Sequence, residues 1–118
     1  MTKVPEGRPS SHAHSETQRR LSYFEERRDA IVATIRELVE IESPSDSKAA
    51  VDRIAVAVAQ KFSQLGGEVR IHQAKDFGNH LQVNFAGKSA KPVLLLGHYD
   101  TVYPLGTLPC PARLPGTS

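Results

Sequence analysis

Apolar residues recur at helical spacing in the first part of the chain. From Ser15 to Ile41 they keep largely to one helical face, and the charged residues between them form the opposite face. Ser15 and Gln18 have the spacing of a capping box, which is typical of a helix start. The pattern predicts one long amphipathic helix, with an apolar face formed by Leu21, Phe24, Ala30, Ile31, Ile35, Leu38 and Val39.

A second helical pattern follows a break in the segment "IESPSDSK". Pro44 disfavours helical geometry at Ser43, and the polar residues after the proline are suitable N-caps. Gly66 and Gly67 supply the left-handed stop that commonly ends a helix. The sequence therefore predicts a second helix between these points, with an apolar face formed by Val51, Ile54, Ala55, Val58, Phe62 and Leu65.

Two short segments with alternating apolar and polar residues come next. "EVRIHQ" and "HLQVNFAG" have the period of strands, and "DFGN" before the second of them is turn-like. This pattern predicts a two-stranded antiparallel ribbon. His72 and His80 fall on its polar face, where a metal-binding pair is an alternative to two solvated side chains.

The run from Val93 to Leu96 is apolar on both faces, which predicts a strand covered on both sides at the centre of an α/β sheet. Functional groups in such sheets collect at the carboxyl ends of strands, where His98 and Asp100 follow. Residues two apart on an extended chain face the same way, about 6.6 Å apart, while Tyr99 faces the other way.

The pair His98 and Asp100 has the residue types of a carboxylate–histidine–metal relay. The carboxylate can accept a hydrogen bond from one imidazole nitrogen, which fixes the tautomer and leaves the other nitrogen to bind a metal ion. A polar loop in which the histidine caps a backbone carbonyl is the alternative. Sequence alone leaves both open for an isolated H-x-D.

Length and charge narrow the class of protein. A chain of 118 residues forms one domain at most, and its net charge of +2 is too small to indicate nucleic acid as a partner. The N-terminus lacks the apolar core of a secretory signal, and no run approaches the ~20 apolar residues of a membrane helix. We therefore expect a cytoplasmic protein with no nucleic-acid or membrane partner.

The sequence gives little support to the other residues that could bind a metal ion. Cys110 is the only cysteine, which excludes an intramolecular disulfide, and it lies between two prolines with no base placed beside it. His12 and His14 belong to a polar segment with nothing that could pack, and we expect them to be solvated.

The stretch "LLLGHYDTVYPLG" closely resembles the first metal-site segment of the zinc-dependent exopeptidases and deacylases. This family includes glutamate carboxypeptidase, acetylornithine deacetylase and succinyl-diaminopimelate desuccinylase. The upstream order agrees: a long helix, "LVEIESPS", a helix ending "LGGEV", and a ribbon with "GNHLQVNFAG". The resemblance covers about residues 20–108, and "HYDTVYPLG" is most similar to the glutamate carboxypeptidase branch.

The resemblance implies a three-layer α/β/α catalytic domain that holds two zinc ions. His98 matches the histidine that binds one zinc, and Asp100 matches the catalytic-site aspartate that orients it. In this family a glutamate serves as general base, and the metals activate water and polarise the amide carbonyl. The implied substrates are N-acyl amino acids or short peptides with a free carboxylate.

The chain departs from the family after Leu108. The segments that would bear the other metal ligands, the general base and the dimerisation domain are replaced by "PCPARLPGTS". We expect a disordered arm at 1–14, the N-terminal part of a catalytic α/β domain at 15–108, and a disordered, non-family tail at 109–118. Truncation by a shifted frame or an interrupted gene is a hypothesis.

A catalytic zinc needs three protein ligands, and only His98 is present in the motif, so we expect no hydrolysis by this chain alone. Leaving one or two of the leucines at 94–96 in water costs several kcal/mol at ~25 cal/mol per Å², which predicts a sticky, partly folded fragment. Two alternatives stay open: a non-catalytic interaction or regulatory fragment, and a mononuclear metal module that combines His98 with His72 or His80.

Overall fold

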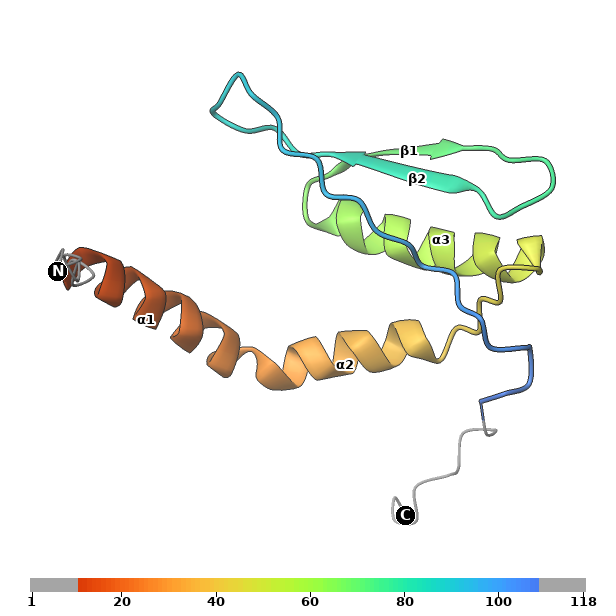
Figure 1. The fold of residues 1–118 in the computed structure, drawn as a ribbon, viewed down its shortest axis with the longest axis horizontal. Coiled ribbons are helices and arrows are strands. Elements are labelled where there is room, and N and C mark those ends of the chain that lie inside the picture. The colour runs from red at the N-terminus through yellow and green to blue at the C-terminus, as the bar shows by residue number, and fades with distance from the viewer. Residues whose placement is uncertain (1–10, 109–118) are drawn as a thin grey trace, which may run out of the picture. The chain divides into compact units, whose positions relative to one another are not determined.

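The computed structural model describes residues 11–108, with side chains from residue 15 onward. This part of the chain contains three helices and a two-stranded antiparallel sheet, so its class is mixed α/β (Figure 1). It divides after Ile35 into two compact units. None of the described helices is long and apolar enough to cross a bilayer.

Two helices occupy the stretch in which the sequence predicts one. Helix α1 spans Ser11–Glu26 and helix α2 spans Arg28–Val39, with a turn at Arg27 between them. Helix α1 begins inside the predicted arm at 1–14, so the end of that segment is helical. Residues 1–10 lie outside the described part of the chain.

The side chain of Arg27 explains the break. Its Nη1 donates to the carbonyl of Tyr23 at 3.2 Å, and the guanidinium lies 3.8 Å from the centre of the Tyr23 ring. The backbone N–H of Arg27 donates instead to the carbonyl of Phe24 at 3.2 Å, one residue short of its α-helical partner. Asp29 in the first turn of α2 favours a new helix start. At Arg27 the side chain replaces the backbone N–H as the donor to the Tyr23 carbonyl, and the spacing of apolar residues cannot predict this replacement.

The second unit is built from helix α3 (Lys48–Gln64) and strands β1 (Glu68–His72) and β2 (His80–Asn84). The two strands pair in antiparallel fashion, and α3 packs against both of them. The predicted second helix and ribbon are therefore confirmed. The apolar cross-strand pairs are Val69 with Val83 and Ile71 with Leu81.

Helix α3 ends where the glycine pair predicts. Gly66 has a φ of 87°, the left-handed conformation that glycine adopts without a steric penalty. Its N–H donates to the carbonyl of Ser63 at 2.9 Å, and the N–H of Gly67 donates to the carbonyl of Phe62 at 2.9 Å. These bonds satisfy carbonyls that the end of the helix leaves without intrahelical partners. At the other end, Ser47 is the N-cap, in an extended conformation.

The buried apolar core of the described residues is small. It consists of one face of α3, and alanine accounts for most of it, so each side chain contributes little buried area. The strand residues beneath it stay partly exposed. The core residues are Ala50, Val51, Ile54, Ala55 and Ala59.

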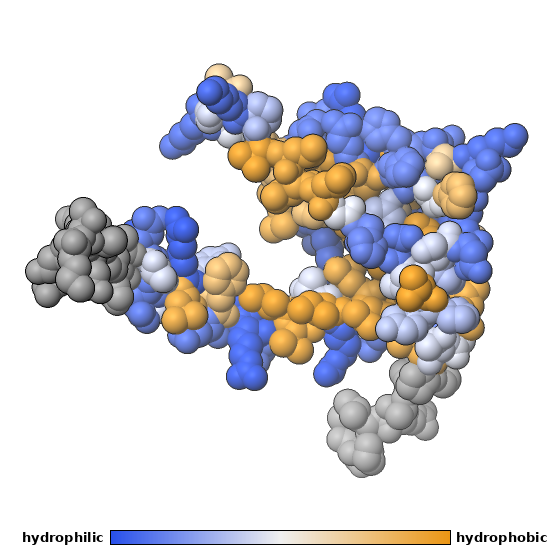
Figure 2. Space-filling view, viewed as in Figure 1, coloured by the Kyte–Doolittle hydropathy of each residue, from blue (hydrophilic) through white to orange (hydrophobic). Residues whose placement is uncertain are grey.

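The predicted central strand at Val93–Leu96 is wrong. The segment has no strand assignment, and its four side chains are between 84% and 92% exposed. A strand requires a neighbour that accepts its backbone hydrogen bonds, and the described sheet contains β1 and β2 only. Figure 2 shows hydrophobic residues gathered on the face that this segment crosses.

Candidate functional site around His98 and Asp100

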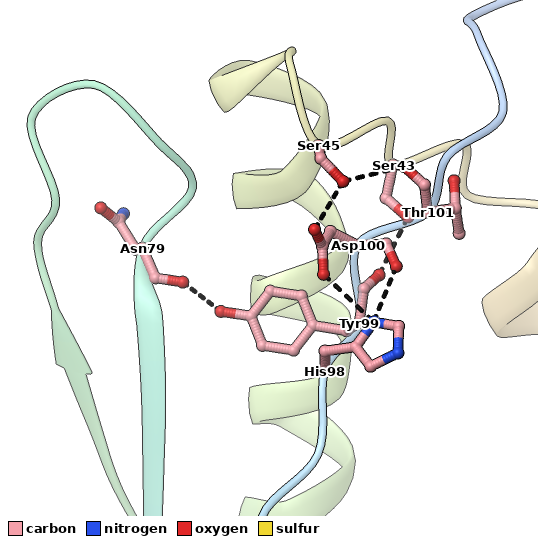
Figure 3. A network of polar contacts seen from close by, with 7 residues as sticks. All are labelled: Ser43, Ser45, Asn79, His98, Tyr99, Asp100 and Thr101. Atoms are coloured by element: carbon pink, nitrogen blue, oxygen red, sulfur yellow. Dashed lines mark hydrogen bonds and ion pairs between the residues drawn. The ribbon is translucent and has the colours of Figure 1, made fainter.

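His98 and Asp100 contact each other as the sequence predicts (Figure 3). Nδ1 of His98 lies 3.2 Å from Oδ1 of Asp100 and 3.1 Å from the Asp100 carbonyl oxygen. A carboxylate and a carbonyl only accept hydrogen bonds, so Nδ1 carries the hydrogen and donates it. In the neutral ring the free lone pair is then on Nε2. The His98 side chain is 84% exposed, and no described residue bonds to Nε2.

The carboxylate of Asp100 is held from its other side by Ser45. The Ser45 hydroxyl donates to Oδ2 of Asp100 at 2.6 Å. This hydrogen bond is the main cause that lowers the pKa of the Asp100 carboxyl, and the hydrogen bond from His98 lowers it further. Asp100 is therefore ionised at neutral pH and is available as an acceptor to His98.

Backbone hydrogen bonds dock the segment that carries this pair. The N–H of Ser45 donates to the carbonyl of Thr101 at 2.9 Å, and the N–H of Thr101 donates to the carbonyl of Ser43 at 2.8 Å. Pro44 and Thr101 form an isolated parallel bridge. Ser43 is fully buried, and its hydroxyl donates to the Tyr99 carbonyl at 3.0 Å. The "ESPS" turn therefore ends a helix and also makes the hydrogen bonds that hold residues 99–101 in place.

Tyr99 points away from His98 and anchors the segment to the turn before β2 (Figure 3). Its hydroxyl donates to the carbonyl of Asn79, whose N–H donates to Oδ1 of Asp52 at 2.8 Å. Lys48 bonds to both Asp52 and Asn79, at 2.9 Å each. Burial raises the pKa of Tyr99, and the charges of Asp52 and Asp100 raise it further, so its hydroxyl stays protonated as a donor.

The ribbon histidines form a second pair. His72 and His80 lie opposite each other in the register of β1 and β2, and both are exposed. Nε2 of His72 is 2.9 Å from Oε1 of Gln82. Within residues 15–108, no group of three or more His, Cys, Asp or Glu side chains is arranged to hold a metal ion.

The described residues fit one position of a zinc site. His98 presents an imidazole whose Nδ1 contacts both a carboxylate and a backbone carbonyl, two of the groups that usually orient zinc-bound histidines. A complete site needs at least three protein ligands, and the residues around His98 do not supply them. The side chains of His12, His14 and Cys110, the other candidate ligands, lie outside the described residues.

Glu42 holds residues 106–108, which follow the site segment, through two hydrogen bonds. Its carboxylate accepts the backbone N–H of Gly106 at 2.8 Å and that of Leu108 at 2.9 Å. Gly106 has a φ of 82°, so glycine is needed for the turn that brings both donors to one carboxylate. These two hydrogen bonds, that from Gly106 first, lower the pKa of Glu42 below its ordinary value of 4.5.

We expect acid to release this fastening. A carboxyl whose pKa is lower in the folded state than in the unfolded chain stabilises folding above pH 4.5, and that contribution disappears as the pH falls through the folded-state value. An acid titration followed by NMR should therefore shift the amide protons of Gly106 and Leu108 together. In Glu42→Gln, which has no titrating group there, the shared transition should be absent. Amide shifts that ignore the substitution would contradict the contact.

Sequence reasoning missed Ser45 and Glu42 as parts of the site. Both lie in the segment that breaks the helical pattern, where polar residues are equally well explained as caps and turns. The one usable signal is that the break is rich in hydroxyl and carboxylate groups and that the site segment follows in the same chain. Nothing in the pattern shows that these two segments meet.

Comparison of the chain with protein-family models, with curated proteins and with solved structures found no match. The resemblance of "HYDTVYPLG" to the zinc-dependent exopeptidases therefore remains an expectation from the sequence.

Proposed function

We propose that residues 15–108 are the N-terminal part of the catalytic domain of a metal-dependent hydrolase that cleaves amide bonds in N-acyl amino acids or short peptides. In this proposal His98 is a ligand to one of two zinc ions, and Asp100 orients His98. The remaining ligands and the general base belong to parts of such a domain that the described residues do not contain.

The hydrogen bond between His98 and Asp100 carries the proposal. The contact of Nδ1 with the Asp100 carbonyl also fits the capping alternative, so the carboxylate is the feature that favours a metal ligand. Here the carboxylate and a carbonyl both occupy the Nδ1 side, at 3.2 and 3.1 Å, and no described residue bonds to Nε2 of this exposed side chain. Metal-bound histidines usually have such a partner on the nitrogen that does not bind the metal.

The roles of the chain's own residues follow from these contacts. When bound, the metal ions would activate water and polarise the carbonyl of the scissile amide. Asp100 holds the ring of His98 in one tautomer, and its negative charge raises the basicity of Nε2. Tyr99 and Ser43 hold the backbone on either side of the pair. One ligand does not make a catalytic zinc site, so we expect no hydrolysis by this chain alone.

A zinc titration of the full chain tests the metal role. We expect the ring nitrogen signals of His98 to respond to Zn²⁺ at Nε2, and only at high metal concentration because a single protein ligand binds weakly. Asp100→Asn should weaken this response by roughly 10- to 100-fold, the usual cost of losing the group that orients a metal-bound histidine.

A histidine substitution provides the control. His72→Ala, which removes another exposed histidine, should leave the response of the His98 ring nitrogens unchanged. Failure of His98 to respond at any zinc concentration would overturn the proposal. Loss of the His98 response in His72→Ala would instead indicate the mononuclear module.

A non-catalytic interaction fragment is the second candidate, because the run Val93–Leu96 is almost fully exposed. Such a fragment requires no ordered tautomer at His98 and no zinc response. The titration above therefore separates the two functions.

A further inference from the structure

Ser45 is exposed, yet its position relative to Asp100 is fixed by the backbone. Its N–H donates to the Thr101 carbonyl at 2.9 Å, and the neighbouring bond from Thr101 to Ser43 measures 2.8 Å. The Ser45 side chain is therefore carried on the same short parallel bridge that holds the residue after Asp100. These backbone hydrogen bonds therefore place the Ser45 hydroxyl beside the Asp100 carboxylate.

The hydroxyl of Ser45 has one hydrogen and two acceptors within reach. Oδ2 of Asp100 is at 2.6 Å and the carbonyl of Thr101 is at 3.0 Å. A hydrogen bond to an ionised oxygen is shorter and stronger than one to a neutral carbonyl, so the hydrogen belongs to the bond with Asp100. The backbone N–H of Ser45 already serves the Thr101 carbonyl.

Occupying Oδ2 fixes the rotation of the Asp100 carboxylate. Oδ1 is then the oxygen left for His98, 3.2 Å from Nδ1 (Figure 3). Without a donor on Oδ2, the carboxylate of a residue that is only partly buried can rotate or turn to water, and His98 loses one of the two acceptors on its Nδ1 side.

We propose that Ser45 is a positioning residue for His98, acting through Asp100 to keep the imidazole hydrogen on Nδ1 and the lone pair on Nε2. Its importance for metal binding rests on the proposed function, but the tautomer itself does not. The hydrogen bonds that link Ser45 to Asp100 and Asp100 to His98 form without a metal ion.

Substituting Ser45 separates this role from docking. Ser45→Ala keeps the backbone N–H that bonds to Thr101 and removes only the hydroxyl. Ser45→Thr keeps a hydroxyl on the same carbon. Ser47→Ala is the matched control, because Ser47 lies in the same turn and its side chain makes no capping hydrogen bond.

The readout is the tautomer of His98, measured by long-range nitrogen–proton NMR on the metal-free full chain at a pH where the ring is neutral. We expect the Nδ1–H form to dominate in the original chain. In Ser45→Ala the ratio of Nδ1–H to Nε2–H should fall roughly two- to tenfold, the range that one lost hydrogen bond corresponds to. Ser45→Thr and Ser47→Ala should both retain the original ratio.

An unchanged ratio in Ser45→Ala, with the Thr101 amide shift also unchanged, would overturn the proposal and leave Ser45 with a docking role only. Dominance of Nε2–H in the original chain would overturn it as well. A fall in the ratio without any zinc response at His98 would support Ser45 as the positioning residue and refute the metal-ligand role. A zinc response with no change in the ratio would do the reverse.

Discussion

Replacing Leu95 with lysine is expected to convert a self-associating chain into a monomer. Leu95 is 91% exposed at the centre of the run Val93–Leu96, which is apolar on both faces. The backbone of this run makes no hydrogen bond with any described residue. Exposed extended segments of this kind pair with copies of themselves, and a charge in the centre prevents the pairing.

The size of the effect follows from the burial of leucine. Burying one such side chain contributes about 1.5–3 kcal/mol, so its loss should weaken association by roughly ten- to a hundredfold. Sedimentation velocity over a range of concentrations measures this directly. We expect the average mass of the original chain to rise with concentration and that of Leu95→Lys to stay at the monomer value.

Leu65→Lys is the matched control for association. Leu65 is also exposed, at 72%, but it is the C-cap of α3 and is not part of an apolar run in the sequence. The control should associate like the original chain. A monomeric original chain at every concentration, or an equal effect of both lysines, would contradict the role of the Val93–Leu96 run.

Gly78→Ala is expected to destabilise the second unit strongly. A Cβ at Gly78 would lie 2.1 Å from Cγ1 and 2.5 Å from Cβ of Val51. Val51 is 5% exposed and β-branched, so it cannot turn aside within the small core. Overpacking of this kind costs about 1–3 kcal/mol, a large part of the stability of a small domain. Hydrogen exchange of the α3 amides, or urea denaturation, measures the loss.

Two further variants make the Gly78 result specific. Gly87→Ala adds the same methyl group where no atom lies within 4 Å, and it should leave the stability nearly unchanged. Val51→Ala in the Gly78→Ala background should destabilise less than the sum of the single changes, because it removes the atoms that clash. Equal effects at the two glycines, or strict additivity, would show that the close approach is not the cause.

Elements that depend on local pattern were predictable from the sequence. Helix α3 and the β1–β2 ribbon have clear periodicity, and Gly66 marks the end of α3 in both sequence and structure. The pairing of His98 with Asp100 was predictable for the same reason, since both residues lie on one short extended segment. Such interactions need no knowledge of distant parts of the chain.

The features that could not be predicted depend on hydrogen-bond partners or neighbouring strands that the pattern of apolar and polar residues does not identify. The break at Arg27 results from one guanidinium taking a carbonyl from the backbone. The strand at Val93–Leu96 fails because apolar residues make a strand only when they pair with another strand, and the described sheet contains β1 and β2 only. The hydrogen bond from Ser45 to Asp100 joins residues 55 positions apart, a separation that no local pattern reports.

That separation has a consequence for the order of folding. Joining Ser45 to Asp100 closes a loop that contains α3, β1 and β2. Closing so long a loop lowers the conformational entropy of the chain before favourable contacts can form. Helix α3 and the hairpin can form from near neighbours in the chain, at much lower contact order. We therefore expect the tautomer-setting geometry at His98 to be assembled last, so that the site exists only in molecules that have completed the fold.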